Sequence, residues 1–263
     1  MMAFAKYEGL GNDFIVVDAA TDDAITSVRA AALCDRRFGI GADGVLLVLP
    51  PRETANVARM KVVNADGSIP EMCGNGLRCV ALHVARARGM ARGDLAFETD
   101  AGVRRCAIDD ERGLGMVTVD MGVVRILGER TVLVDDARVT VVVADAGNPH
   151  AVLFGEFSRA TVDALGPRVA THSAFPEGTN VEFARVVDGG IDLVVWERGV
   201  GVTLACGTGA CATVAVACAN GLAKPDVATT VNLPGGALSI TLESGSGRAI
   251  MRGPARRVFT GVC

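Results

Sequence analysis

Short apolar runs separated by glycine, asparagine and aspartate turns dominate the chain and predict strands. Apolar and β-branched runs bounded by turn residues are typical of strands. The expected strands cover residues 3–8, 14–18, 45–49, 57–64, 95–99, 103–108, 115–121 and 191–196. One of the turns, at residues 39–44, is rich in glycine. Because a strand and not a helix is expected after it, this turn is only a weak indication of a phosphate site.

Segments with a helical pattern interrupt these strands. Residues 26–37 fit a helix, and Thr26 is its expected N-cap because a threonine oxygen can accept a hydrogen bond from the first turn. Two more helices are expected directly after Cys73 and Cys206, the first of them ending near residue 88. The mixture of strands and helices predicts an α/β (α+β) protein.

The second half of the chain repeats the plan of the first. Four features recur in one order, 132 to 136 residues later: Gly11-Asn12 as Gly147-Asn148, Gly67 as Gly199, Cys73 as Cys206, and Gly102 as Gly236. Such spacing indicates an internal duplication. We expect two pseudo-symmetric domains, 1–118 and 119–263, with the last strand free to return to the first domain. The join lacks a Pro/Gly/Ser linker, and a site shared by two repeats is expected in the cleft between them.

Composition narrows the class of protein. The chain has 263 residues, of which 50% are hydrophobic and 21% charged, which indicates a well-packed globular protein. A net charge of −4 gives no indication of a nucleic-acid partner, and no apolar run reaches the length of a membrane span. The first residues lack the layout of a secretion signal, so we expect a cytoplasmic protein with reduced cysteines.

The residue types that hold common cofactors are sparse. The chain has three lysines, Lys6, Lys61 and Lys224. None of them lies in an evident site, which argues against a pyridoxal-phosphate Schiff base. The eight cysteines form no C-x-x-C pair and the three histidines are scattered, which argues against a zinc site. We therefore expect neither a cofactor nor a metal.

Two stretches each place a cysteine directly before a helix: Cys73-Gly74-Asn75-Gly76 and Cys206-Gly207-Thr208-Gly209. The free N–H groups and the positive dipole end of a helix N-terminus lower a thiol pKa from about 8.5 toward neutrality. The same N–H groups bind carboxylates well. If the stretches face each other, one thiol can remove a proton from an α-carbon while the other returns one. The alternative is that both are buried structural cysteines.

Polar residues at other turns are further candidates. Four asparagines, Asn12, Asn64, Asn148 and Asn180, occupy turns after or between strands. Neutral amides can orient ammonium and carboxylate groups without adding charge, although asparagine is also common in turns for purely local reasons.

Three charged or titratable residues complete the candidate set. Glu197 and Arg198 lie eight or nine residues before Cys206 in an apolar neighbourhood. Arginine can hold a carboxylate through two parallel hydrogen bonds, and a glutamate can hold an ammonium group or bias a thiol. His150 can tune a thiolate near neutral pH. The alternative for Glu197 and Arg198 is an exposed ion pair that contributes little to stability. The alternative for His150 is a hydrogen-bonded loop histidine.

These residues lie in motifs that resemble the diaminopimelate epimerase family, whose pyridoxal-independent enzymes interconvert LL- and meso-2,6-diaminopimelate. The motifs span nearly the whole chain: Phe4-x-Lys6-x-x-Gly9-x-Gly11-Asn12-Asp13-Phe14, Asn64-Ala65-Asp66-Gly67-Ser68, Cys73-Gly74-Asn75-Gly76-x-Arg78-Cys79, Gly147-Asn148-Pro149-His150, Gly178-Thr179-Asn180-Val181-Glu182-Phe183, and Glu197-Arg198-Gly199-x-Gly201-x-Thr203-x-Ala205-Cys206-Gly207-Thr208-Gly209. The chain departs from the family at Gly44, where many members have glutamine, and at Ile69, where an acidic residue is frequent.

The resemblance implies roles for the candidate residues. Cys73 and Cys206 match the two bases of the family, and His150 and Glu197 match residues that adjust the thiol pKa values. The residues that match substrate contacts are Asn12, Asn64, Gly74, Asn75, Asn148, Asn180, Glu197, Arg198, Gly207 and Thr208. The resemblance also implies that each repeat is a curved, mostly antiparallel sheet wrapped around a central helix. It implies a cytoplasmic homodimer that acts on diaminopimelate without a cofactor.

Two rival functions remain open. The first is a racemase of another amino acid on the same fold, such as proline, hydroxyproline or histidine. Its substrate would have no distal carboxylate to pair with Glu197-Arg198. A thiol redox module would leave the two matched anion-binding turns without a use, and neither Cys73 nor Cys206 has a C-x-x-C partner.

Overall fold

The computed structural model describes residues 1–111, 113 and 115–263, which form two units. The first comprises Met1–Asp120 and Arg252–Cys263, and the second comprises Met121–Met251. The chain passes between the units within two strands, β7 (Met116–Val123) and β16 (Arg248–Pro254). The last strand, β17 (Arg256–Val262), therefore belongs to the first unit.

In the first unit, the pairing of neighbouring strands alternates between antiparallel and parallel from β1 to β6. The elements are β1 (Ala3–Gly9), β2 (Asn12–Asp18), α1 (Ser27–Cys34), β3 (Gly44–Leu49), β4 (Ala58–Asn64), α2 (Gly74–Ala87), β5 (Arg92–Thr99) and β6 (Gly102–Asp109), with β17 and the start of β7. Antiparallel pairs are β1–β2, β3–β4, β5–β6, β6–β7 and β1–β17, whereas β2–β3 and β4–β5 are parallel. Helices α1 and α2 make the two crossovers that parallel pairs require.

The second unit repeats this order. Its elements are β8 (Arg125–Val134), β9 (Ala137–Asp145), β10 (Pro149–Phe154), α3 (Arg159–Ala170), β11 (Asn180–Val187), β12 (Gly190–Glu197), β13 (Gly201–Val202), α4 (Gly207–Ala219), β14 (Thr229–Leu233) and β15 (Gly236–Leu242). Antiparallel pairs are β8–β9, β9–β10, β11–β12 and β14–β15, whereas β10–β11 and β12–β14 are parallel and are bridged by α3 and α4. The repeated pairing order confirms the predicted duplication.

The turn glycines used to detect the duplication also match in conformation. Gly67 and Gly199 have φ values of 83° and 77°, and Gly11 and Gly147 have φ values of 79° and 92°. Side chains rarely adopt this left-handed region, so these turns favour glycine in both repeats.

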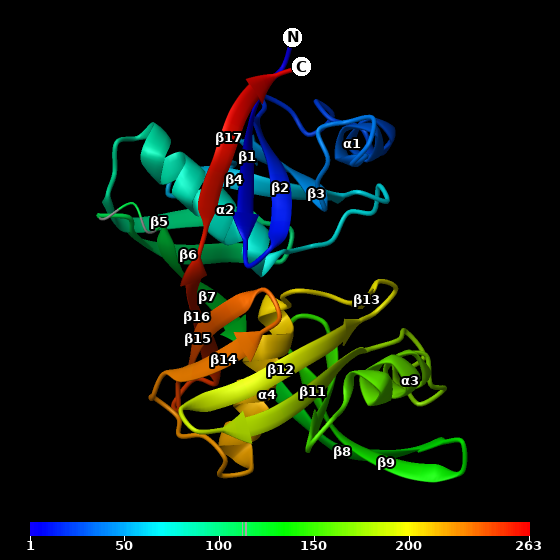
Figure 1. Cartoon of the computed structure of the whole chain (residues 1–263). Helices are drawn as coiled ribbons and strands as arrows, with labels where there is room; N and C mark the ends of the chain where they lie inside the picture. Colours follow the sequence, from blue (N-terminus) through cyan, green and yellow to red (C-terminus); the bar gives the residue numbers. More distant parts are fainter. Residues whose placement is uncertain (112, 114) are drawn as a thin grey trace. The chain divides into compact units, whose positions relative to one another are not determined.

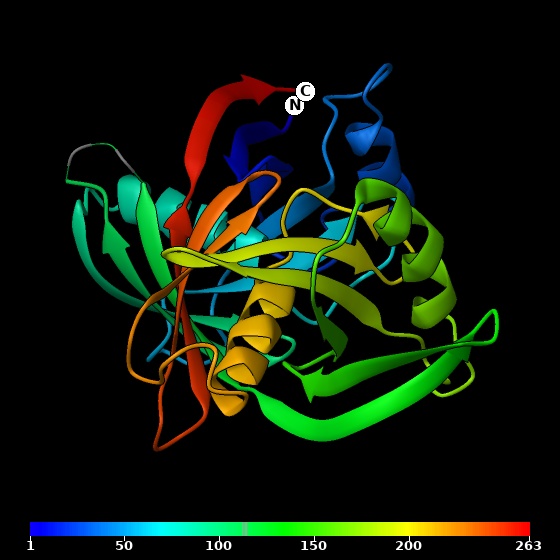
Figure 2. The same ribbon diagram turned by 60° about the horizontal axis from the view of Figure 1, so that its bottom comes forward.

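Each unit has one central helix with apolar surroundings. Helix α2 packs against strands β1 to β6 and β17, and α4 packs against β9, β10, β11 and β15. The two helices are visible within their own strands in Figures 1 and 2. Helix α4 is built entirely from Gly, Ala, Val, Thr and Cys, and it is buried on all sides from Gly209 to Ala217. Small side chains all round a helix let sheet strands approach it closely.

One helix boundary differs from the prediction. Thr26 is the N-cap of α1, as expected, and its Oγ1 accepts a hydrogen bond from the Arg29 N–H at 3.2 Å. The predicted end at residue 37 is wrong, because α1 ends at Cys34. Asp35 Oδ1 accepts hydrogen bonds from the N–H groups of Arg37 and Phe38 at 2.7 and 2.8 Å, and this local turn replaces the last helical turn.

The two chain ends pair with each other in the first unit. Met2 donates its N–H to Cys263 at 2.6 Å, and Cys263 donates its N–H to Met2 at 3.0 Å. Both ends lie side by side in Figures 1 and 2. In the part of the chain that the structure describes, no helix has the length and apolar character that crossing a membrane requires.

Candidate active site

The central helix of each unit begins at a cysteine whose sulfur caps it. Cys73 has φ −136° and ψ 111°, and its Sγ accepts the Gly76 N–H at 3.3 Å. Cys206 has φ −122° and ψ 109°, and its Sγ accepts the Gly209 N–H at 3.4 Å. A sulfur in the N-cap position takes the place of the usual Ser, Thr or Asp oxygen. The local sequence thus fixes both thiols against helix N-termini in the same geometry.

The third residue after each cysteine is a glycine with close neighbours. A Cβ at Gly76 would lie 3.4 Å from Cys73 Sγ and 3.0 Å from Leu46 Cδ2. A Cβ at Gly209 would lie 3.3 Å from Cys206 Sγ and 2.9 Å from Glu182 Oε1. The C-x-x-G spacing therefore leaves room for the sulfur over the helix start in both units.

The surroundings of Cys206 favour its protonated thiol form. The residue is 7% exposed. Burial raises the pKa of its thiol well above the ordinary value, and the charges of Glu197 and Glu182 raise it further, against hydrogen bonds from Thr208 and Gly209. The predicted pKa near neutrality is therefore wrong for Cys206, because desolvation and two carboxylates outweigh the helix dipole. The raised pKa favours the protonated thiol form of Cys206.

Glu197, at the end of β12, stands beside this thiol. Its Oε1 accepts a hydrogen bond from the Thr203 hydroxyl at 2.6 Å. Burial and the charge of Glu182 raise the pKa of Glu197, while Thr203, His150 and the Cys206 thiol act in the opposite direction. A carboxylate with a raised pKa next to a thiol can share that thiol's proton.

His150 lies in β10 and is fully buried. Its Nδ1 is 2.6 Å from Glu182 Oε1, and its Nε2 is 2.8 Å from Asn148 Oδ1. Both ring nitrogens therefore have a hydrogen-bond partner, and the ring is held between Glu182 and Asn148. Among its neighbours, His150 acts electrostatically on Glu197 and lowers the pKa of that carboxyl.

The other predicted polar residues of this unit also have defined partners. Asn180, at the start of β11, is 5% exposed, and its Oδ1 accepts the backbone N–H of Arg198 at 2.9 Å. Arg198 donates from Nη1 to the Glu177 carbonyl at 2.7 Å. Its side chain lines a pocket of about 580 Å³ together with Trp196 and Phe175. The structure thus links Asn180 to Arg198, and His150 to Asn148.

In the first unit, amides lie around the cysteine-capped helix. Asn75, on the first turn of α2, donates from Nδ2 to Asn12 Oδ1 at 3.3 Å. Asn12 donates from its own Nδ2 to Asp43 Oδ2 at 2.6 Å, which fixes the orientation of its amide. Asn64 donates to Ser68 Oγ at 2.9 Å within the turn that follows β4. Asn12 and Asn75 are therefore brought together, whereas Asn64 has its described side-chain contact within its own turn.

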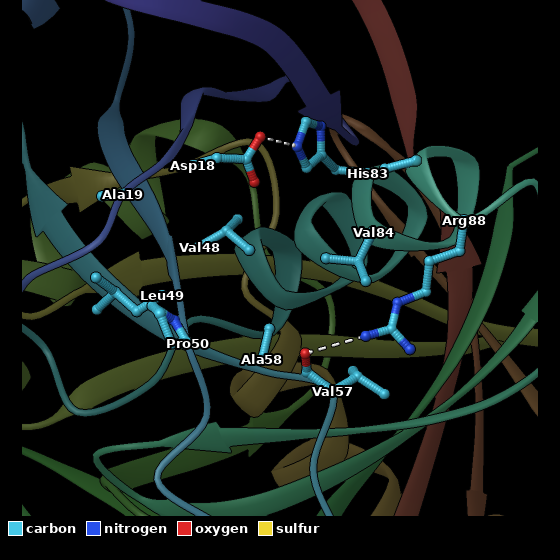
Figure 3. A pocket seen from close by; sticks show the side chains of 11 residues that line it. Asp18, Ala19, Val48, Leu49, Pro50, Val57, Ala58, His83, Val84 and Arg88 are labelled. Atoms are coloured by element: carbon cyan, nitrogen blue, oxygen red, sulfur yellow. Dashed lines mark hydrogen bonds and ion pairs between the residues drawn. The ribbon is translucent and has the colours of Figure 1, made fainter. Parts of the chain in front are cut away.

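A second pocket of about 420 Å³ lies in the first unit and contains none of the predicted site residues. It is shown in Figure 3, where His83 points to Asp18 and Arg88 points to the Val57 carbonyl. His83 Nε2 is 3.1 Å from Asp18 Oδ2, and the ring meets Tyr7 edge-on. These contacts agree with a structural role for His83.

Sequence reasoning missed Glu182 and Asp43 as parts of the two clusters. Glu182 lies in β11 on the same face as Asn180, because alternate residues of a strand share a face. A buried glutamate in the otherwise apolar run Val181–Ala184 is a signal that alternation could have revealed. Asp43 gives no comparable signal, since its contact with Asn12 joins residues 31 apart.

Comparison with solved structures identifies the fold. A probable proline racemase from Agrobacterium radiobacter K84 matches with a TM-score of 0.77 at 16% identity, covering 100% of this chain and 93% of that chain. A predicted epimerase from Pseudomonas aeruginosa matches with a TM-score of 0.78 at 14% identity, covering 100% and 99%. The fold is therefore the duplicated α/β fold found in racemases and epimerases.

Comparison of the sequence is more specific. The model of the diaminopimelate epimerase family matches residues 4–127 and 142–258. Diaminopimelate epimerase 1 from Nostoc sp. strain PCC 7120 is 43% identical over 98% of both chains. The diaminopimelate epimerase from Synechocystis sp. strain PCC 6803 is 41% identical over 99% of this chain and 98% of its own. The chain belongs to the diaminopimelate epimerase family, and it is an isomerase.

Proposed function

We propose that the chain converts LL-2,6-diaminopimelate to meso-2,6-diaminopimelate without a cofactor, using Cys73 and Cys206 as its two acid–base groups. The observation that carries this proposal is the matched pair of cysteine-capped helices, one in each repeat, with nearly equal backbone angles. Inversion at one carbon needs a proton acceptor on one face and a proton donor on the other. A duplicated fold supplies two equivalent groups for that task.

The reaction uses the two thiols in opposite protonation states. The thiolate of Cys73 takes the α-proton, the electron pair stays on the α-carbon, and the Cys206 thiol gives its proton to the opposite face. After one turnover Cys73 carries a proton and Cys206 is the thiolate, which is the state that runs the reaction in reverse. The retained proton of Cys206 supports its role as donor in the first direction.

The substrate's polar groups need partners that stabilise the developing charge. Helix N-termini stabilise carboxylates, so we assign the α-carboxylate to the N–H groups at Gly74-Asn75 and Gly207-Thr208. The amides Asn12, Asn64, Asn148 and Asn180 bind the remaining amino and carboxylate groups. Glu197 and His150 set the charge around Cys206, and Arg198 binds the distal carboxylate through its guanidinium.

Epimerisation of LL-diaminopimelate in deuterated water tests this function. We expect meso product that carries one deuterium at the inverted carbon, formed by protein that has been dialysed against a chelator. L-Proline serves as the control substrate and should not racemise, because it has no distal carboxylate. Activity that requires added pyridoxal phosphate or metal, or racemisation of proline without epimerisation of diaminopimelate, would contradict the proposal.

The family resemblance also supports a cytoplasmic homodimer. Light scattering coupled to size-exclusion chromatography should give twice the mass of the 27.1 kDa chain. A single-chain mass across the working concentration range would contradict the dimer.

A further inference from the structure

Asp43 lies in the turn before β3, between two turns of the first unit that carry candidate asparagines. Its backbone N–H donates to the Asp13 carbonyl at 2.8 Å, and its own carbonyl accepts the Ala65 N–H at 3.0 Å. The first bond reaches the residue that follows Asn12, and the second reaches the residue that follows Asn64. The backbone of Asp43 is therefore fixed beside both asparagines.

The carboxylate of Asp43 meets a hydrogen-bond donor at each oxygen. Oδ1 accepts from Arg36 Nη2 at 2.7 Å, and Oδ2 accepts from the Asp13 N–H at 3.0 Å. Guanidinium and backbone N–H groups only donate, so both oxygens act as acceptors. The amide of Asn12 lies 2.6 Å from the same Oδ2, and the end of the amide that faces this oxygen is therefore its NH₂ group.

The orientation of Asn12 determines that of Asn75 in turn. With its NH₂ group on Asp43, Asn12 directs Oδ1 to the first turn of α2, where Asn75 Nδ2 donates to it at 3.3 Å. Asn75 follows Cys73 by two residues, so this row of side chains ends at the start of the cysteine-capped helix. A carbonyl oxygen has two lone pairs, so Asn12 Oδ1 can accept from one further donor.

We propose that Asp43 is a positioning residue that orients the amides of Asn12 and Asn75, so that Asn12 offers its oxygen to an amino group of the substrate. The link to the substrate rests on the proposed function, whereas the orientation of the two amides does not. Without the carboxylate, the amide of Asn12 would be free to turn over and present its NH₂ group, which cannot accept from an ammonium group. Asp43 thus acts through Asn12.

Arg36 holds the carboxylate from its other side. Its Nη2 bridges Asp43 and Asp13, at 2.7 and 2.6 Å. An asparagine at position 43 would have an NH₂ group in place of one carboxylate oxygen. That group would face either Arg36 or the Asp13 N–H, and both of these are donors. Because the Arg36 side chain is 58% exposed, it can turn to solvent and leave the amide oxygen to Asn12.

The first experiment reads the amide of Asn12 by NMR of ¹⁵N-labelled protein. The chain has eight asparagines and no glutamine, so all side-chain amide signals come from asparagine, and Asn12→Ala assigns the signal of Asn12. A hydrogen bond of 2.6 Å to a carboxylate should shift one NH₂ proton of Asn12 downfield and slow its exchange with water. In Asp43→Ala this proton should return to the ordinary shift and exchange rate.

Asp163→Ala is the matched control for this experiment. The Asp163 side chain is 47% exposed, close to the 41% of Asp43, and it pairs with Arg159 at 2.9 Å. Its replacement should leave the Asn12 signal unchanged. An ordinary Asn12 signal in the unmodified protein, or one that Asp43→Ala does not move, would overturn the proposal. Neither outcome depends on whether the protein epimerises diaminopimelate.

The second experiment measures kcat/KM for LL-diaminopimelate in Asp43→Ala, Asn12→Ala and the double variant. Each single substitution should lower kcat/KM roughly tenfold, mainly through KM, because a hydrogen bond to a charged substrate group is weakened. The double variant should lose little more than Asn12→Ala alone, since the two residues act as one unit. Asp43→Asn, which keeps an oxygen for Asn12, should recover part of the loss.

Additive losses in the double variant would overturn the proposal, because Asp43 would then act by a route other than Asn12. Wild-type kinetics in Asn12→Ala would overturn the link to the substrate. If Asp43→Ala fails to fold, Asp43→Asn replaces it in the NMR experiment. A neutral amide oxygen is a weaker acceptor than a carboxylate, so the downfield shift should shrink, and an unchanged Asn12 signal in Asp43→Asn would overturn the proposal.

Discussion

The two cysteine-capped helices have the same backbone and different electrostatic surroundings. In both units the thiol accepts the N–H of the third following residue, at 3.3 and 3.4 Å. Around Cys206 lie the carboxylates of Glu182 and Glu197, of which Glu182 contacts His150 at 2.6 Å. At the start of α2, the amide of Asn75 donates to that of Asn12.

The two carboxylates next to Asn12 in the first unit, Asp13 and Asp43, are balanced by cations. Asp13 binds Lys6 and Arg36, and Asp43 binds the same Arg36 at 2.7 Å. In the second unit burial raises the pKa of Cys206, and the charges of Glu197 and Glu182 raise it further. The helix start therefore sets where each thiol lies, while burial and residues from neighbouring strands keep the proton on Cys206.

Replacing either cysteine by serine has the largest expected effect. A serine hydroxyl is a far weaker acid than a thiol, so Cys73→Ser and Cys206→Ser should each lower kcat on the order of a thousandfold or more. The remaining thiol can still exchange the α-proton on its own face of the carbon. In deuterated water one variant should therefore label the LL form and the other the meso form. Mass spectrometry after chiral separation measures both.

The matched control for this pair is Cys263→Ser, because Cys263 is exposed at the chain end. It should keep wild-type kinetics. Near-normal epimerisation by either Cys73→Ser or Cys206→Ser would refute the two-base mechanism.

Glu197→Gln tests how strongly the charge of Glu197 acts on the thiol of Cys206. Removing this charge should lower the pKa of Cys206, while burial still keeps it above the ordinary value. Alkylation of Cys206 by iodoacetamide at mildly alkaline pH should become faster, with the exposed Cys263 as the internal reference. Catalysis should fall about tenfold to a hundredfold, since a charged hydrogen-bond acceptor is worth about 1.5–3 kcal/mol. Unchanged or slower alkylation at Cys206 would show that the charge of Glu197 does not reach the thiol.

Part of the site could be read from the sequence because its signals are local. A cysteine followed by Gly-x-Gly predicts a capped helix start, and the recurrence of Cys73 as Cys206 predicts the duplication. The end of α1 was not predictable in the same way, because it depends on the side-chain turn at Asp35 and not on the apolar pattern.

The protonation of Cys206 could not be read from the sequence. The helix dipole, which lowers a thiol pKa, comes from the residues that follow Cys206 in the sequence. The carboxylates that raise the pKa of Cys206 come from β11 and β12. The contact between Glu182 and His150 depends on the parallel register of β10 and β11, in which His150 pairs with Asn180. A single sequence does not specify that register.

Replacing Gly76 or Gly209, the third residue after each cysteine, by alanine has the smallest expected effect. The pair also compares the two units most directly, because both glycines lie against the sulfur of a capping cysteine. Alanine favours a helix over glycine by roughly 0.8–1.0 kcal/mol, and the new methyl group would lie 3.4 and 3.3 Å from the respective sulfurs. At Gly76 it also meets Leu46 Cδ2 at 3.0 Å, the end of a flexible side chain that can shift. Gly76→Ala should therefore stay within about 1 kcal/mol of wild type in unfolding free energy.

Gly209→Ala should behave differently, because the same methyl group meets Glu182 Oε1 at 2.9 Å, and this oxygen is held 2.6 Å from His150 Nδ1. Displacing the carboxylate weakens a buried charged hydrogen bond, so we expect a loss of roughly 1–3 kcal/mol in unfolding free energy and a fall of about tenfold in kcat/KM. Urea unfolding and steady-state kinetics of both variants measure the difference. Because the contacts with the sulfurs are nearly equal, equal losses at Gly76 and Gly209 would mean that crowding of the thiol, and not displacement of Glu182, accounts for the effect.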